Sequence, residues 1–305
     1  MTGTDAVTGA FGFTGRAIAE QLLASGRQVV TLSRRRGDRD ELAGRIAVAP
    51  LDFGRPDLLA EALQGVDTLY NTYWLRFPRA GMGYDRAVEQ SAILLAAAER
   101  AGVERLVHVS VVHADPQGAT PYVRAKGRLE AMIARGGLPA TIVRPTLTFG
   151  PADVLINNLA WAMRRLPVYG IPGDGSYRIQ PVHVDDVARI CVEAAGLEPG
   201  TIVDAAGPET MTYREMITVV REAIGSRALV LGMPTPLVLA AARMVGLLTR
   251  DVVLTRDELR ELTSGFLASD EPATGRIDFR GWVAEHATTL GRRWSSELAR
   301  NYRHA

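Results

Sequence analysis

The sequence predicts an α/β protein, a doubly wound parallel sheet joined to a smaller, mainly helical C-terminal lobe. Over the first two-thirds of the chain, short β-rich apolar runs alternate with helical patterns. Strands separated by helices in this way form a parallel sheet covered on both faces. A glycine-rich turn also joins the first strand to the first helix, and in such sheets this turn lies at the edge where ligands bind.

The elements of the sheet domain follow one another closely. Strands are expected over 5–10, 28–32, 45–52, 67–74, 105–111 and 139–145. Helices are expected over 14–26, 56–65, 85–102 and 121–137. Their crossovers should be right-handed. We assign this domain to residues 1–150 and expect it to be completed by about 181–207, where one more helix and strand occur.

Residues 151–305 are expected to form mainly the C-terminal lobe. Two helices there have capping-box starts, with Thr212 followed by Glu215 and Thr255 followed by Glu258. The most apolar long segment, 237–248, is interrupted by Arg243 and falls short of the ~18–20 residues that span a bilayer. We expect a buried helix or a subunit contact there, and no membrane partner.

Composition excludes several classes of function. The chain has 305 residues and a net charge of +1, which argues against nucleic acid as a partner. Its single cysteine, Cys191, allows no internal disulfide and reads as a buried thiol, which fits a cytoplasmic protein. Five histidines and one cysteine show no ligand spacing, so no metal site is expected.

The stretch V-T-G-A-F-G-F-T-G predicts a phosphate-binding turn. We expect Gly9 to permit the turn, Gly12 to permit a close approach by a pyrophosphate, and Gly15 to let the helix pack on the strand. Phe11 and Phe13 lie within the same loop and are predicted to contact the cofactor that carries this pyrophosphate. The alternative is a tight turn with no ligand.

Four motifs in order carry a family resemblance. They are T-G-A-F-G-F-T-G, Y-V-R-A-K, R-P-T-L-T-F-G-P and G-D-G-S-Y-R-I-Q-P-V-H-V-D-D-V-A. Together they resemble the extended and atypical short-chain dehydrogenase/reductases over roughly residues 5–215. The resemblance implies a Rossmann domain, a nicotinamide cofactor and a substrate lobe. Atypical members include proteins that bind NADPH without turning it over, such as respiratory-complex subunits and redox-sensing regulators.

The end of the second strand favours NADP over NAD. It reads T-L-S-R-R-R, with no acid before Asp38 to bond the ribose hydroxyls. Ser33 can hydrogen-bond a 2′-phosphate, and Arg34 or Arg35 can pair with it. The alternative is a solvated basic turn. The resemblance also assigns Asp52 to the adenine, although an acid ending a strand is a common cap.

The resemblance places two further residues beside the cofactor. Asn71 follows the fourth strand, and Pro145 ends the sixth strand next to the nicotinamide ring.

Tyr122 and Lys126 are the predicted catalytic pair. They lie four residues apart on one helix and therefore share a face. A nearby ammonium lowers a phenol pKa from its usual ~10, so Tyr122 can exchange a proton with a carbonyl oxygen. Ser110 is the candidate orienting hydroxyl, or only the end of a strand. The family's hydroxyl often lies where Val111 and Val112 stand.

Other candidates are weaker. Residues proposed to contact substrate are Trp74, Arg76, His113, Asn157, Asn158 and Arg178. His183, Asp185 and Asp186 are expected to be structural. Arg164 and Arg165 either grip a second pyrophosphate or form a solvated face. The stretch after Ser110 has no acidic pair, which disfavours dehydratase chemistry.

The resulting prediction is an NADP(H)-dependent oxidoreductase that acts on a carbonyl or secondary alcohol of a small metabolite, with an epimerase as a variant. One alternative is a non-catalytic NADPH-binding protein, and another is a non-redox isomerase or cyclase on the same fold. The resemblance also suggests a homodimer formed through the helices over 85–102 and 121–136. The sequence leaves the substrate, the direction of reaction and the oligomeric state open.

Overall fold

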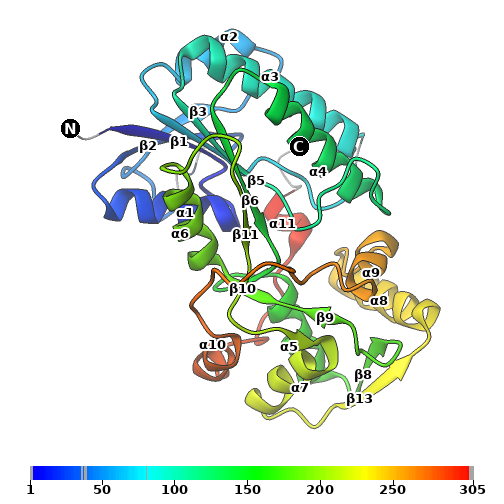
Figure 1. Cartoon of the computed structure of the whole chain (residues 1–305). Coiled ribbons are helices and arrows are strands. Elements are labelled where there is room, and N and C mark those ends of the chain that lie inside the picture. The colour runs from blue at the N-terminus through cyan, green and yellow to red at the C-terminus, as the bar shows by residue number, and fades with distance from the viewer. Residues whose placement is uncertain (1–2, 36, 38–39, 80, 302–305) are drawn as a thin grey trace. The chain divides into compact units, whose positions relative to one another are not determined.

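The computed structural model describes residues 3–35, 37, 40–79 and 81–301. They form two compact units (Figure 1). The first unit comprises Met1–Pro145 and Val187–Ala205, and the second comprises Thr146–Asp186 and Ala206–Ala305.

The first unit is built on a seven-stranded sheet. Its strands, in chain order, are β1 (Thr4–Thr8), β2 (Gln28–Ser33), β3 (Ala47–Pro50), β4 (Thr68–Asn71), β5 (Arg105–Val109), β6 (Ala140–Pro145) and β11 (Ile202–Ala205). They are ordered β11-β6-β5-β4-β1-β2-β3, and every neighbouring pair is parallel. The winding therefore reverses between β1 and β4, which confirms the predicted doubly wound fold.

Helices cover both faces of this sheet. They are α1 (Phe13–Ala24), α2 (Pro56–Ala62), α3 (Tyr84–Ala101), α4 (Pro121–Arg135) and α6 (Val184–Ala194), which belongs to this unit from Val187 onward. Figure 1 shows α2, α3 and α4 together on one face and α1 with α6 on the other. Buried leucines pack α2, α3 and α4 onto the sheet, among them Leu59, Leu94 and Leu129.

The fourth strand is shorter than predicted, because it ends at Asn71 instead of Trp74. The backbone beyond it leaves the ladder for side-chain partners. The Thr72 N–H donates to Thr8 Oγ1 over 2.7 Å, and the Tyr73 N–H donates to Asn71 Oδ1 over 3.0 Å. These bonds satisfy the N–H groups that a longer strand would have paired.

The second unit has helices and three small sheets. Its helices are α5 (Leu155–Arg165), α7 (Tyr213–Ala223), α8 (Thr235–Thr249), α9 (Arg256–Thr263), α10 (Phe279–His286) and α11 (Glu297–Asn301). The sheets pair β7 (Leu147–Phe149) with β10 (Pro181–His183), β8 (Val168–Pro172) with β13 (Leu229–Met233), and β9 (Arg178–Ile179) with β12 (Met211–Thr212). The core surrounds Phe149, which contacts Phe279 and Trp282 edge to face. Both predicted capping boxes are present.

The segment over 237–248 is helical but is not the buried helix that was one of its two expected roles. Only Val238 and Gly246 of α8 are buried, and the other role, a subunit contact, remains a prediction. The segment has no distinct polar face that would turn its leucines toward the interior, and most of its leucines are exposed. Within the described ranges, no helix is long and apolar enough to cross a membrane.

Candidate functional site

The glycine loop joins β1 to α1 at the point where the winding reverses. Gly9 has φ +68°, a left-handed conformation that favours glycine, and the Gly12 N–H donates to its carbonyl over 2.8 Å. A Cβ on Gly15 would lie 2.4 Å from the Gly9 carbonyl oxygen. The turn at Gly9 and the close helix packing at Gly15 are therefore as expected from the sequence.

Among the described residues, the N-cap of α1 supplies no side-chain acceptor to the helix start. Gly12 is the N-cap and makes no side-chain cap bond, and the first turn contains no acidic residue. The first N–H groups and the helix dipole thus leave a partial positive charge without a capping side chain. An anionic group such as a pyrophosphate fits this helix start.

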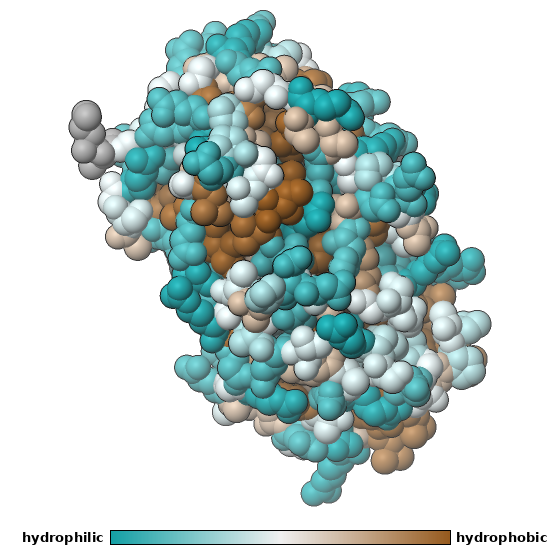
Figure 2. Space-filling model, in the orientation of Figure 1, coloured by the Kyte–Doolittle hydropathy of each residue, from teal (hydrophilic) through white to brown (hydrophobic). Residues whose placement is uncertain are grey.

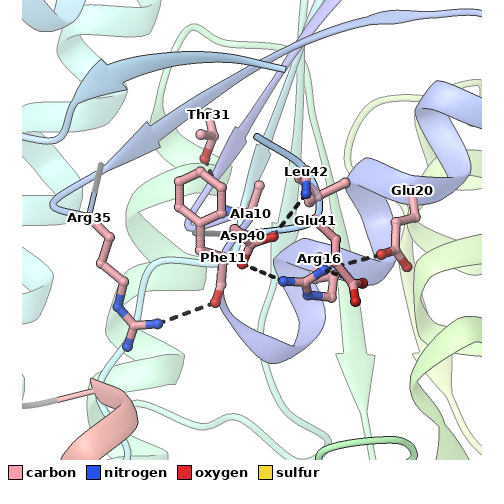
Figure 3. Close-up of polar contacts among 9 residues, drawn as sticks. All are labelled: Ala10, Phe11, Arg16, Glu20, Thr31, Arg35, Asp40, Glu41 and Leu42. Atoms are coloured by element: carbon pink, nitrogen blue, oxygen red, sulfur yellow. Dashed lines mark hydrogen bonds and ion pairs between the residues drawn. The ribbon is translucent and has the colours of Figure 1, made fainter. Parts of the chain in front are cut away.

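The segment after β2 folds back onto the glycine loop (Figure 3). Arg35 Nη1 donates to the Phe11 carbonyl oxygen over 3.3 Å, and the Arg35 N–H donates to Ser33 Oγ over 3.0 Å. Further along, Asp40 accepts from Arg16 on α1 over 2.5 Å. Phe11 is buried, and a Cβ on Gly37 would lie 2.1 Å from its ring. Ser33 and Arg35 therefore lie beside the loop, as a role at the ribose requires.

Asp52 acts as a cap in the structure. Its carboxylate accepts from the Gly54 N–H over 3.0 Å and from Arg55 Nε over 2.8 Å. These bonds lower the pKa of Asp52, with the Arg55 bond the larger cause. The structural alternative stated for this residue is thus realised, and adenine recognition by Asp52 remains a prediction.

A buried polar network links the ends of β1, β4 and β5. Thr8 Oγ1 donates to Asn71 Oδ1 over 3.3 Å, and Asn71 Nδ2 lies 3.2 Å from His108 Nδ1. Burial holds the pKa of His108 well below its usual value, with a further contribution from Lys126. His108 was not singled out from the sequence, because a histidine inside a strand carries no local signal. The network fixes the β4 end beside the glycine loop.

Lys126 is buried on α4, four residues after Tyr122, the predicted acid/base. It is 2% exposed, its Nζ donates to the Val109 carbonyl over 3.0 Å, and the same Nζ lies 4.3 Å from the centroid of the Trp74 ring. The half-buried Tyr122 meets Trp74 and Tyr84 edge to face, at 6.2 and 5.7 Å between centroids. The predicted pair and Trp74 therefore share one aromatic cluster of the first unit.

Burial lowers the pKa of Lys126 from 10.5 to about 7, against the opposing effect of Glu130. Between these values the unfolded chain binds a proton that the folded chain does not. The contribution of Lys126 to the free energy of unfolding is therefore fully present above pH 10.5 and is lost as the pH falls to 7. Relative to Lys126→Met, the wild-type protein should gain up to about 1.4 kcal/mol per pH unit over this range. Urea unfolding of both proteins at about pH 7 and about pH 9.5 checks this, and a pH-independent difference would contradict it.

Ser110 and His113 occupy different environments. Ser110 is buried, and its Oγ has no hydrogen-bond partner among the described residues. Such an orphaned hydroxyl needs a reason, and an incoming ligand supplies one. His113 is exposed with φ +55°, an uncommon backbone for a residue with a side chain. Between them Val111 and Val112 are buried and have no polar side chain.

The candidates in the second unit are already bonded within the protein. Asn157 bonds the Arg293 carbonyl and the Gly291 N–H over 2.9 and 3.0 Å, and Asn158 bonds both backbone groups of Ser295 over 2.9 Å. These contacts tie α5 to the C-terminal segment. Substrate contact by Asn157 therefore remains a prediction that competes with a structural role.

The arginines of this unit are also engaged. Arg164 and Arg165 donate to backbone carbonyls near the end of α5, including those of Leu290 and Gly291. Arg178 lies 3.9 Å from Asp270 and is exposed. Asp186 accepts from the N–H groups of Arg276 and Ile277, each over 2.8 Å, which is the kind of structural role predicted for it.

Two other candidates belong to the first unit. Pro145 is buried, and its carbonyl accepts from the Val112 N–H over 3.2 Å. The Arg76 carbonyl accepts from the Tyr84 hydroxyl over 3.0 Å, which places Arg76 next to the aromatic cluster. Over the described ranges, no three histidine, cysteine, aspartate or glutamate side chains are grouped to hold a metal.

Comparison with known proteins decides the family. A family described as NAD(P)H-binding matches residues 9–196, more than half of the chain and all three loop glycines. The chain belongs to this family. This confirms the prediction of an NAD(P)H-binding family.

Curated relatives of this NAD(P)H-binding protein differ in their assigned roles. The mitochondrial NADH dehydrogenase [ubiquinone] 1 alpha subcomplex subunit 9 of Arabidopsis thaliana is 25% identical over 87% of this chain and 70% of that protein. The ceramide reductase of Caulobacter vibrioides is 27% identical over 80% of this chain and 77% of that protein.

A solved structure shares the fold. The NADPH-dependent quinone oxidoreductase of Escherichia coli, in complex with NADPH, superposes with a TM-score of 0.74 at 22% identity. The match covers 93% of this chain and 99% of that one.

Proposed function

We propose that the protein is an NADP(H)-dependent oxidoreductase that transfers hydride to or from a carbonyl or secondary alcohol of a small metabolite. Tyr122 is the acid/base, Lys126 sets its proton affinity, and Ser110 orients the substrate oxygen. The observation that carries the proposal is the burial of Lys126, which lies on the same helix as Tyr122. Its Nζ donates to the Val109 carbonyl and lies over the Trp74 ring. A buried lysine is costly, and a catalytic role accounts for it.

The proposed chemistry divides between cofactor and chain. The nicotinamide supplies or accepts the hydride. In the direction of reduction, the Tyr122 phenol gives its proton to the carbonyl oxygen while Ser110 Oγ–H donates to the same oxygen. The Lys126 ammonium favours the resulting phenolate. Because the pKa of Lys126 is about 7, this assistance declines as the pH rises above neutrality.

The NADP preference is supported by the environment of the loop. Arg35 already donates to the Phe11 carbonyl, and a guanidinium has five N–H donors, so it can hold that carbonyl and a phosphate together. Arg34 is exposed next to it. The Ser33 hydroxyl accepts from the Arg35 N–H, and its own proton can be donated to a 2′-phosphate oxygen.

A second candidate function is a protein that binds NADPH without turnover. Val111 and Val112 favour it, because they are buried where the family's orienting hydroxyl is often found. The Arabidopsis relative bears the name of a respiratory-complex subunit, whereas the Caulobacter relative is named as a reductase.

The two functions differ in whether hydride leaves the cofactor. NADPH deuterated at the transferring carbon of the nicotinamide is incubated with the protein and a panel of aldehydes, ketones and quinones. For an aldehyde or ketone that serves as substrate, we expect deuterium on the carbon of the new alcohol. Tight NADPH binding with no alcohol or hydroquinone formed and no oxidation of NADPH would favour the non-catalytic function.

A further inference from the structure

The exposed side of α8 carries a continuous apolar stripe, which we call the α8 stripe. Its large members are Leu237, Met244, Leu247 and Leu248, which are 57%, 65%, 76% and 82% exposed. Ala240 and Ala241, also exposed, lie between them. Residues 237, 240, 241, 244, 247 and 248 follow helical spacing and therefore form one face.

The strand that precedes α8 also exposes leucines. Leu229 and Leu231 of β13 are 61% and 44% exposed, and β13 leads through Pro234 into α8. Figure 2 shows brown, hydrophobic atoms at the lower right, where Figure 1 draws β13 and α8. By contrast, α7 of the same unit buries its apolar residues, including Met216 and Ile217. An apolar surface of this kind marks an interaction site.

The charged residues of α8 and its C-cap are of one sign. Between Pro234 and Arg250 the charged residues are Arg243 and Arg250, and both are exposed. Arg227, just before β13, is exposed as well. A helix with leucines on one side and arginines beside them suits the interface of an anionic bilayer, because the long arginine side chains reach the headgroups while the leucines enter the acyl region.

A second copy of the chain fits this surface less well. Fifteen residues of helix extend about 22 Å, and a stripe about 10 Å wide then covers roughly 220 Å², well below the roughly 800 Å² per partner of a stable interface. Arg243 also lies next to the middle of the helix. Two copies packed antiparallel through this face would bring their Arg243 side chains together, which is unfavourable.

We propose that the α8 stripe docks the protein on the surface of a membrane that contains anionic lipids. The helix lies in the interface with Leu237, Met244, Leu247 and Leu248 buried among the acyl chains, while Arg243 and Arg250 contact lipid phosphates. This binding is peripheral and independent of the cofactor. It revises the sequence-based expectation of no membrane partner.

The test is sedimentation of the full-length protein with vesicles. Wild-type protein is expected to bind phosphatidylcholine vesicles that contain phosphatidylglycerol, and to bind pure phosphatidylcholine vesicles much more weakly. The double variant Leu247→Gln/Leu248→Gln should reduce binding to the anionic vesicles by about tenfold or more, given the apolar area withheld from lipid. Both positions are so exposed that the fold should be unaffected.

Two further variants separate the contributions. Leu166→Gln/Leu197→Gln changes two exposed leucines outside the stripe and should leave vesicle binding at the wild-type level. Arg243→Glu should weaken binding to the anionic vesicles alone, and added salt should reduce the difference between wild type and this variant.

Three outcomes would overturn the proposal. The first is no binding of the wild type to anionic vesicles. The second is equal binding by the Leu247→Gln/Leu248→Gln variant. The third is a wild-type dimer in size-exclusion chromatography that this same variant converts to a monomer, because a second copy would then cover the stripe.

Discussion

Tyr122→Phe is expected to lower the rate of deuteride transfer from NADPH by about 10²- to 10⁴-fold, the usual contribution of a positioned acid/base. The substitution removes the phenolic proton that balances the incoming hydride. It keeps the ring that contacts Trp74 and Tyr84. The Kd for NADPH should therefore stay close to the wild-type value, and the variant should lose turnover instead.

Tyr84→Phe is the matched control for this change. It deletes another hydroxyl of the same aromatic cluster, one that donates to the Arg76 carbonyl over 3.0 Å. This hydroxyl takes no part in the proposed proton transfer, so the rate should change by less than about tenfold. Undiminished transfer in Tyr122→Phe would remove the acid/base role from this residue.

Gly15→Ala is expected to damage the nucleotide site from within. The added Cβ would lie 2.4 Å from the Gly9 carbonyl oxygen and 2.8 Å from its carbon, so α1 must move away from the turn. Overpacking of this kind costs about 1–3 kcal/mol. Because the same shift displaces the helix start, the Kd for NADPH should rise by about tenfold or more, together with a lower melting temperature.

Gly83→Ala controls for the loss of a glycine. Gly83 precedes α3 with extended backbone, and a Cβ there meets no atom within 4 Å. Its effect on the Kd for NADPH should be small. Alanine is less favourable than glycine at an N-cap, by up to about 1 kcal/mol, so a modest fall in melting temperature is expected. Circular dichroism at the titration temperature establishes that Gly15→Ala is folded, and an unchanged Kd in that folded variant would show that the loop geometry does not matter for binding.

The predictable part of the fold rests on local chemistry. The turn needs Gly9 and the packing of α1 needs Gly15, and both requirements involve residues only a few positions away. The capping boxes at Thr212 and Thr255 are equally local. The alternation of strands and helices then determines a doubly wound sheet through the handedness of its crossovers. For these reasons the first unit was largely predictable from sequence.

What escaped prediction depends on residues far apart in the chain. His108 meets Asn71 across 37 positions, and Asn157 reaches Arg293 across 136, so neither contact leaves a local pattern. The α8 segment shows a further limit. The sequence of an apolar helix is the same whether its leucines face a core or an external partner. Only the exposure of these leucines in the structure distinguishes the two cases.

The site combines predicted and unpredicted features. The positions of Tyr122 and Lys126 on one helix followed from their spacing. The depth of Lys126, its bond to the Val109 carbonyl and its contact with Trp74 did not. The orphaned hydroxyl of Ser110 likewise depends on the burial around it, which spacing does not encode.

NADP(H) binding at the glycine loop is tested by titrating purified, cofactor-free protein with NADPH and then NADH, following nicotinamide fluorescence. The proteins compared are the wild type, Arg34→Ala and the exposed-arginine control Arg45→Ala. We expect micromolar NADPH binding, weaker NADH binding, and a loss of about tenfold or more for NADPH alone in Arg34→Ala. Equal affinities for the two nucleotides would contradict the NADP preference, and binding of neither would show that the loop does not hold NADP(H).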